Sequence, residues 1–303
     1  MLSYGPSPIQ QLDIASFTTK NLQVWVKRDD LIHPFISGNK SRKLKYLLLD
    51  AAQKNQRHLV TFGGAFSNHL LATAAAAAEN GFRSTGFARG EPVQNDMLLL
   101  CRLMGMDLRF VSREDYRDKQ GLFYRYFFGD TDAYFIAEGA AGELGALGCE
   151  EIVTELPRDF DHIICACGTG TTVSGILNGL SAQKKHTRIH VVPILKDSGF
   201  LKEAIDGLLK SPVEYNFHSA YHFGGYAKTD EHLIDFIKKF IAKTGILIDP
   251  VYTGKAFYAL FDLIEKGVIK EGGSTLVIHT GGTFGLLGMR EKFFPQILSK
   301  KHR

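Results

Sequence analysis

The chain has 303 residues, of which 45% are hydrophobic and 22% are charged, and this composition excludes fibrous and intrinsically disordered proteins. Its formal net charge is only +4, with basic and acidic residues interspersed, so a nucleic-acid partner is not indicated. The sequence contains neither an apolar run long enough for a membrane helix nor a signal-peptide pattern at its start. We therefore expect a cytoplasmic protein that does not bind a membrane.

Cysteine usage indicates no structural framework. Cys101, Cys149, Cys165 and Cys167 are too few for a disulfide scaffold at this length, and Cys165 and Cys167 lack the second pair that a zinc site needs. We expect all four to be reduced and buried. We also expect no metal site.

Short β-rich runs alternate along the chain with longer segments of helical periodicity. The β-rich runs cover residues 24–27, 59–62, 84–88, 107–111, 162–166 and 188–194. The helical segments cover residues 40–55, 67–80, 171–183 and 232–245. This alternation predicts an α/β fold, in which helices flank mostly parallel, twisted sheets.

Domain boundaries are weakly marked, because no linker rich in proline, glycine or serine interrupts the chain. Residues 43–132 contain a compact set of strand and helix patterns. We interpret this segment as a small α/β domain inserted into a larger one. The large domain is then predicted to comprise residues 1–42 and 133–303.

The first segment with chemical meaning lies at residues 38–44, Gly-Asn-Lys-Ser-Arg-Lys-Leu, where a polar loop starts a helix. Lys40 stands at the positive end of that helix dipole, which disfavours a cation. Such an environment favours a neutral amine, the form that attacks an aldehyde cofactor. The alternative is an exposed lysine among its neighbours Lys43 and Lys45.

A loop rich in glycine and threonine, residues 165–175, follows the apolar run 162–166 and opens a helix. Its backbone N–H groups, its hydroxyls and the helix dipole favour an anion, so we interpret it as a phosphate-binding loop. A dinucleotide fingerprint would need glycine at Val173, and a nucleotide P-loop would need lysine at Ile176. The alternative is a tight turn that binds nothing.

Taken in order, six motifs resemble the family of aminocyclopropane-carboxylate deaminases and D-cysteine desulfhydrases, from residue 4 to about residue 288. The motifs are KRDDL at 27–31, GNKSRKLKYL at 38–47, GGAFSNH at 63–69, GTGTT at 168–172, DPVYTGK at 249–255 and HTGG at 279–282. The resemblance implies pyridoxal 5'-phosphate as cofactor, a small amino acid as substrate and a homodimer. It also implies PLP fold type II, the tryptophan-synthase-β-like fold.

The resemblance assigns residues to the cofactor. Lys40 matches the lysine that holds the cofactor as a Schiff base, and Lys43 matches a lysine near its phosphate. Asn68 matches the residue that hydrogen-bonds the ring hydroxyl. The residues that match the phosphate-binding loop are Thr169, Gly170, Thr171 and Thr172.

Substrate and catalytic roles are implied in the same way. Ser67, Asn68 and the backbone of His69 match the site of the substrate carboxylate, and Ser67 and Asn68 also fit a helix N-cap. Tyr226 and Tyr252 match two active-site tyrosines, for which core packing is the alternative. The implied catalytic residues are Lys40, Ser67, Tyr226 and Tyr252.

Two threonines bear on the reaction. Thr253 stands where the deaminases carry a glutamate that faces the pyridine nitrogen, and Thr280 stands where they carry a leucine. We assign both to the cofactor site, where a hydroxyl can only hydrogen-bond a neutral ring, whereas a carboxylate would keep the ring protonated. Both positions favour β-elimination from D-cysteine, giving pyruvate, hydrogen sulfide and ammonia. Phe66 replaces a glutamine of the relatives. Phe66 and the aromatic cluster at 121–129 either shape the pocket or fill the core, and we expect them in the core.

The sequence leaves three alternatives open. The first is 1-aminocyclopropane-1-carboxylate deaminase activity on the same fold. The second is a non-catalytic protein that binds a phosphorylated ligand through the loop at 168–172. The third is a nicotinamide dehydrogenase, which the incomplete glycine fingerprint disfavours.

Overall fold

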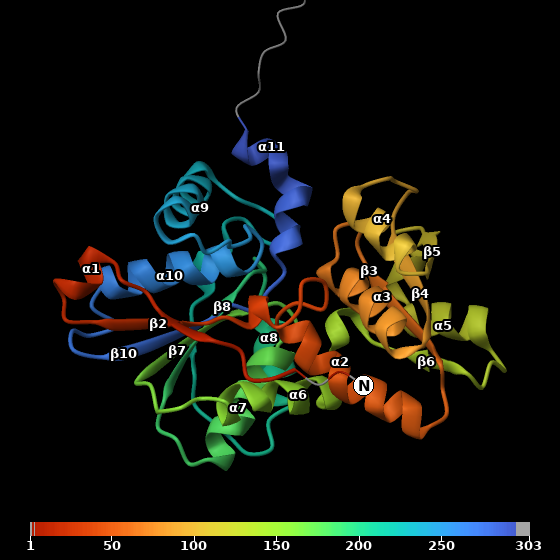
Figure 1. Ribbon diagram of the computed structural model, residues 1–303, viewed down its shortest axis with the longest axis horizontal. Coiled ribbons are helices and arrows are strands. Elements are labelled where there is room, and N and C mark those ends of the chain that lie inside the picture. Colours follow the sequence, from red (N-terminus) through yellow and green to blue (C-terminus); the bar gives the residue numbers. More distant parts are fainter. Residues whose placement is uncertain (1, 3, 295–303) are drawn as a thin grey trace, which may run out of the picture.

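The computed structural model describes residues 2 and 4–294, and it contains two sheets flanked by helices (Figure 1). The larger sheet has the strand order β1-β2-β10-β7-β8-β9. In that order its strands are Ile9–Gln11, Gln23–Lys27, Ser274–Ile278, His162–Cys167, Arg188–Pro193 and Asn216–Phe217. Strand β1 pairs with β2 in antiparallel fashion, and all other pairings are parallel. The predicted α/β fold with mostly parallel sheets is confirmed.

The smaller sheet is entirely parallel and has the order β5-β4-β3-β6. In that order its strands are Met106–Val111, Arg83–Arg89, His58–Gly63 and Ala133–Phe135. This sheet is therefore built by one continuous stretch of chain. The exact domain limits stay a prediction, and the outermost residues of the predicted large domain, 1, 3 and 295–303, lie outside the described residues.

The helices alternate with the strands, as the periodicity predicts. The α-helices are α1 Ala15–Thr18, α2 Asn39–Gln53, α3 Asn68–Asn80, α4 Asp96–Leu103, α5 Lys119–Phe127, α6 Glu143–Thr154, α7 Thr171–Ala182, α8 Gly199–Asp206, α9 Glu231–Thr244, α10 Thr253–Glu265 and α11 Arg290–Phe293. The short 3₁₀ helices are η1 Asp29–Leu31, η2 Asp115–Arg117, η3 Glu138–Ala140, η4 Ser219–His222 and η5 Thr283–Met289. Among the described residues, no helix is both long and apolar enough to cross a membrane.

Helix α6 packs closely against both α2 and α7, and glycines make this possible. A Cβ atom at Gly148 of α6 would lie 2.1 Å from the backbone oxygen of Arg42 in α2. A Cβ atom at Gly175 of α7 would lie 2.3 Å from the oxygen of Ala146 in α6. Because real contacts at these distances are repulsive, only glycine allows the approach. The start of α2 is thereby held beside the start of α7.

The four cysteines are buried and free, as the sequence predicts. Within the described part of the chain, no cluster of three or more His, Cys, Asp or Glu side chains could hold a metal ion.

Candidate active site

A cavity of about 540 Å³ lies where the carboxyl ends of strands from both sheets meet. Parallel strands place their carboxyl ends on one edge, which is the usual position of a ligand site in α/β proteins. The predicted site residues that line the cavity are Lys40, Lys43, Ser67, Asn68, His69, Thr169, Gly170, Thr172, Tyr226, Tyr252 and Thr280. Two predicted site residues, Thr171 and Thr253, do not line it.

Lys40 lies in the first turn of α2, directly after a backbone contact between two motifs. Gly38 has φ +67°, and a Cβ atom there would lie 1.8 Å from the oxygen of Thr280. The Lys40 Nζ donates to Asn39 Oδ1 at 3.0 Å, and Asn39 Nδ2 donates to Thr172 Oγ1 at 2.9 Å. Asn39 thus links the Lys40 amine to the glycine- and threonine-rich loop.

The two cavity lysines have no carboxylate in ion-pair contact among the described residues, although Lys43 is buried and Lys40 is partly buried. Burial lowers the pKa of Lys40 to about 7, and the nearby Lys43 cation acts in the same direction. Burial also lowers the pKa of Lys43, whose Nζ donates to the carbonyl of Gly139 at 3.3 Å. An anion between these amines would offset the cost of burying their charge.

The loop at residues 168–172 provides the neighbouring half of an anion site. Gly170, with φ +82°, is the N-cap of α7, so the first N–H groups of that helix lack helical partners. Thr169 and Thr172 line the cavity, whereas Thr171 is fully buried and receives a hydrogen bond from the Thr169 hydroxyl at 3.4 Å. The phosphate-loop interpretation therefore has suitable geometry, with Thr171 as internal support.

The start of α3 is both a helix N-cap and a part of the cavity wall, as the two interpretations of the sequence allow. Ser67 is the N-cap, and its Oγ accepts a hydrogen bond from the N–H of Leu70 at 3.3 Å. Asn68 lines the cavity, and the glycine at 282 leaves room for its side chain, since a Cβ there would lie 2.8 Å from Asn68 Nδ2. The His69 ring contacts Thr61 Oγ1 at 2.7 Å, and burial lowers its pKa well below the usual range. His69 is therefore a neutral packed side chain.

Tyr226 and Tyr252 meet edge to face, with ring centroids 6.2 Å apart. Tyr226 is 47% exposed and lines the cavity, so the core alternative is wrong for this residue. Burial raises the pKa of the Tyr252 phenol, and loss of hydration in the cavity wall, together with the Glu138 carboxylate, raises that of Tyr226. At neutral pH they therefore keep their protons and can donate hydrogen bonds.

The two threonines of the cofactor prediction differ in their surroundings. The Thr253 hydroxyl donates to Asp249 Oδ1 at 2.7 Å and accepts from the Asp249 N–H at 2.8 Å. The hydroxyl proton of Thr253 is therefore donated to Asp249, within the turn that starts α10. Thr280 lines the cavity at the carboxyl end of β10. Of the two hydroxyls, that of Thr280 is the one placed to meet a ligand.

Phe66 does not fill the core, so that expectation is wrong. It is 45% exposed, lines the cavity and packs against Gly288, where a Cβ atom would lie 2.9 Å from its ring. The aromatic cluster at 121–129 is only partly in the core, because Tyr124, Tyr126 and Phe128 are exposed. Phe66 directly precedes the N-cap Ser67, and its ring lies against the η5 segment that contains Gly288.

Other lining residues were missed by the sequence reasoning, notably Asn39, Arg89 and Glu138. Asn39 stands next to Lys40 in its motif. Arg89 ends strand β4, and Glu138 follows strand β6. A search for polar residues directly after each predicted strand would have found Arg89.

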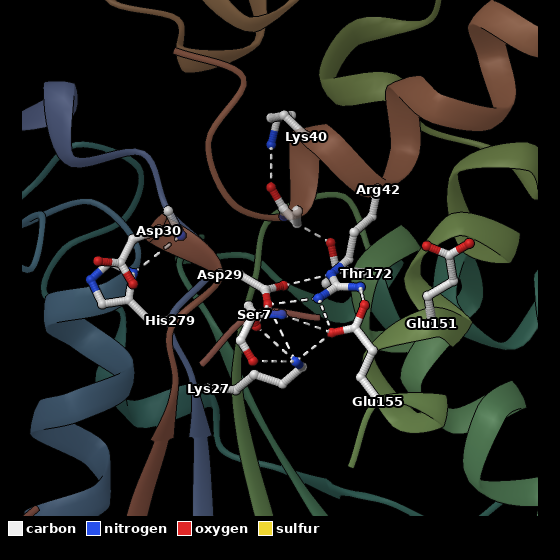
Figure 2. A network of polar contacts seen from close by, with 12 residues as sticks. Ser7, Lys27, Asp29, Asp30, Lys40, Arg42, Glu151, Glu155, Thr172 and His279 are labelled. Atoms are coloured by element: carbon white, nitrogen blue, oxygen red, sulfur yellow. Dashed lines mark hydrogen bonds and ion pairs between the residues drawn. The ribbon is translucent and has the colours of Figure 1, made fainter. Parts of the chain in front are cut away.

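Beneath Lys40, a buried network of charged groups joins α2 to its surroundings (Figure 2). Arg42 donates to both Asp29 oxygens at 2.7 and 2.8 Å and to both Glu155 oxygens at 2.7 and 2.8 Å. Lys27 donates to Glu155 at 2.6 Å and to the Ser7 hydroxyl at 2.7 Å. The network ties the N-terminal segment, β2 and the end of α6 to the turn of α2 that carries the lysines.

The sequence profile of the family described as "Pyridoxal-phosphate dependent enzyme" matches residues 1–281. The chain belongs to this family. It is therefore an enzyme with pyridoxal phosphate as cofactor, which removes the non-catalytic and nicotinamide alternatives. The predicted PLP fold type II is confirmed.

Individual similar proteins indicate which enzymes of this family the chain resembles. A Thermotoga maritima protein with the provisional name 1-aminocyclopropane-1-carboxylate deaminase is 34% identical, over 96% of this chain and 98% of its own. An Arabidopsis thaliana protein named bifunctional D-cysteine desulfhydrase/1-aminocyclopropane-1-carboxylate deaminase is 31% identical, over 94% of this chain and 78% of its own. A crystal structure of an "ACC deaminase homologue" is 32% identical, covers 97% of this chain and 94% of its own, and superimposes with a TM-score of 0.88. The predicted family resemblance is confirmed.

The cavity of this pyridoxal-phosphate enzyme fits two parts of the cofactor, its phosphate and its aldehyde. The phosphate needs N–H donors and a cation, which the start of α7 and Lys43 can supply. The aldehyde needs an amine that is neutral near pH 7, and the lowered pKa of Lys40 meets this need. These assignments stay proposals about individual residues.

If Lys43 contacts the phosphate, we expect Lys43→Met to weaken cofactor binding by at least about tenfold, since a hydrogen bond to a charged group contributes about 1.5–3 kcal/mol. The measurement is absorbance titration of the apoenzyme with pyridoxal phosphate. Lys45→Met is the matched control, because Lys45 lies in the same helix but pairs with Glu151. Equal dissociation constants for the two variants would contradict the Lys43 assignment.

Proposed function

We propose that the enzyme catalyses β-elimination from a small amino acid, with D-cysteine as substrate. One water is consumed, and the products are pyruvate, hydrogen sulfide and ammonia. The observation that supports this reaction is that the described cavity wall presents the Thr280 hydroxyl and no unpaired carboxylate, while the Thr253 hydroxyl is held by Asp249 outside the lining. Glu138 is the single carboxylate among the described lining residues, and it pairs with Lys119 at 3.2 Å. A strongly protonating partner for the cofactor ring is therefore not provided by the lining side chains.

When bound, pyridoxal phosphate withdraws electrons from the α-carbon of the attached amino acid. In our proposal, Lys40 holds the cofactor and its Nζ accepts the α-proton once the substrate has displaced it. A lysine whose pKa is lowered to about 7 has a substantial neutral fraction at neutral pH, as a base requires. Asn39 accepts the hydrogen bond that orients this amine.

The remaining proposed roles concern binding. The N–H groups at the start of α3, with Ser67 and Asn68, bind the substrate carboxylate. Tyr226 and Tyr252 donate hydrogen bonds to the substrate, because their raised pKa values make them poor bases. Phe66 and Tyr226 cover the cavity mouth and limit the access of water. We further propose that the enzyme is a cytoplasmic homodimer.

Ring-opening deamination of 1-aminocyclopropane-1-carboxylate is the second candidate, and the names of the relatives favour it. The deciding experiment compares pyruvate and sulfide formation from D-cysteine with 2-oxobutyrate formation from the cyclopropane substrate, using L-cysteine as the control for chirality. We expect kcat/KM to be at least about tenfold higher for D-cysteine, which is a difference of about 1.4 kcal/mol in the barrier. A preference for the cyclopropane substrate would reverse the assignment.

A further inference from the structure

The loop that presents Tyr226 has an unfavourable backbone. Phe223, Gly224, Gly225 and Ala227 all have positive φ angles, of 50°, 90°, 116° and 54°. Phe223 and Ala227 carry a Cβ atom, and left-handed backbone costs such residues about 1 kcal/mol or more. The loop therefore needs contacts from elsewhere to keep Tyr226 in place.

Lys255 supplies those contacts from the first turn of α10. Its Nζ donates to the backbone oxygens of His222 and Gly225, both at 2.8 Å. The side chain is fully buried, and no described carboxylate lies within ion-pair distance of it. Burying a lysine amine is costly unless hydrogen bonds replace its hydration. Here both replacements come from the loop at residues 222–227.

The same turn of α10 also fixes the second tyrosine. Tyr252 is the N-cap of α10, three residues before Lys255. Both side chains therefore leave one short stretch of backbone at the start of α10. Lys255 therefore connects the Tyr226 loop to the helix turn that carries Tyr252. The two rings meet edge to face, with centroids 6.2 Å apart, where these two segments come together.

We propose that Lys255 is a positioning residue, which holds the loop at residues 222–227 so that Tyr226 lies against Tyr252 at the cavity. It does not touch the reacting atoms, since it is absent from the cavity lining. The inference rests on the proposed roles of the two tyrosines. Its structural half, the attachment of the loop, is independent of any activity.

The test compares Lys255→Met with Tyr221→Phe. Methionine keeps the apolar length of the side chain but removes the donor. Tyr221→Phe removes the hydrogen bond from Tyr221 to Asp262 at 2.6 Å, which joins the same elements η4 and α10 without reaching the loop. Hydrogen exchange measured on the holoenzyme should become faster for the amides of residues 222–228 in Lys255→Met and stay unchanged in Tyr221→Phe.

Kinetics provide a second readout. Lys255→Met should lower kcat for the preferred substrate by at least about tenfold, as expected when a side chain that hydrogen-bonds the substrate is misplaced, whereas Tyr221→Phe should stay within about twofold. In the Tyr226→Phe background, Lys255→Met should lower kcat further by less than about twofold, because the effects of residues that act as a unit are not additive.

Unchanged loop exchange in Lys255→Met overturns the attachment of the loop. Faster exchange with additive kinetic losses overturns the route through Tyr226. If Lys255→Met does not fold, Lys255→Gln takes its place, because glutamine keeps two N–H donors in the buried site. Its side chain is shorter than that of lysine, so hydrogen exchange in the loop must still be faster than in the wild type. If the wild type converts neither D-cysteine nor the cyclopropane substrate, the proposed function fails, and the exchange comparison still decides the attachment.

Discussion

We expect Lys40→Ala to lower turnover of D-cysteine by at least about a thousandfold, because one amine is proposed to hold the cofactor and to move the α-proton. The neighbouring Lys43 cannot replace it, since its Nζ is directed to the carbonyl of Gly139. The measurement is pyruvate formation by enzyme reconstituted with excess pyridoxal phosphate. Lys45→Ala, in the same helix but paired with Glu151, is the control and should stay near wild-type activity.

Borohydride reduction adds a readout that does not require turnover. In the wild type, reduction should remove the visible absorption of the holoenzyme and leave the cofactor covalently attached to Lys40. Because the neutral amine is the nucleophile and its pKa is lowered to about 7, attachment of the cofactor to the apoenzyme should become faster as pH rises from about 6 to about 8. A label on another lysine, or substantial activity of Lys40→Ala, would mean that the catalytic amine lies elsewhere.

Asp29→Ala should lower the free energy of unfolding by about 3–5 kcal/mol, the usual cost of removing one partner from a buried ion pair. The substitution removes the Asp29 carboxylate, which accepts two hydrogen bonds from Arg42 and has one oxygen 3.8 Å from Lys27 Nζ. Two buried cations would then share Glu155. Urea unfolding monitored by circular dichroism measures the change.

The control for this prediction is Asp107→Ala, which breaks an exposed pair with Arg109 in β5. Exposed pairs contribute about 1 kcal/mol or less. Similar losses of unfolding free energy in the two variants would show that the buried network beneath Lys40 contributes no more to stability than an exposed ion pair. Because Arg42 lies between Lys40 and Lys43 in α2, we also expect Asp29→Ala to weaken cofactor binding.

Much of this architecture could be predicted because its signals are local. The β-rich run at 162–166 and the loop after it follow directly from apolar residues and a glycine cluster, and both appear in the structure as β7 and the start of α7. The motif around Lys40 identified a helix start. Since parallel strands end on one edge, the motifs that follow them converge on one cavity.

The parts that could not be predicted depend on side-chain direction and on distant pairing. Motif matching placed Thr253 at the cofactor, but the adjacent turn offers Asp249 as a partner for its hydroxyl. Phe66 was expected in the core because aromatic residues are usually buried, yet its position before the N-cap of α3 directs it to the cavity. Strand β10 was not predicted, and its partner β2 lies near the other end of the sequence.

That pairing has a consequence for synthesis on the ribosome. Strand β2 pairs with β10 in parallel, from Gln23 with Ser274 to Lys27 with Ile278, so one edge of β2 waits until almost the whole chain has been translated. The four strands of the smaller sheet lie between them in the sequence, and even its most distant pairing, β3 with β6, joins strands that are much closer in sequence than β2 and β10. Local contacts form earlier than distant ones, because closing a long loop is entropically costly. The smaller sheet should therefore fold cotranslationally, while β2 depends on β1 or on chaperones to protect it from aggregation.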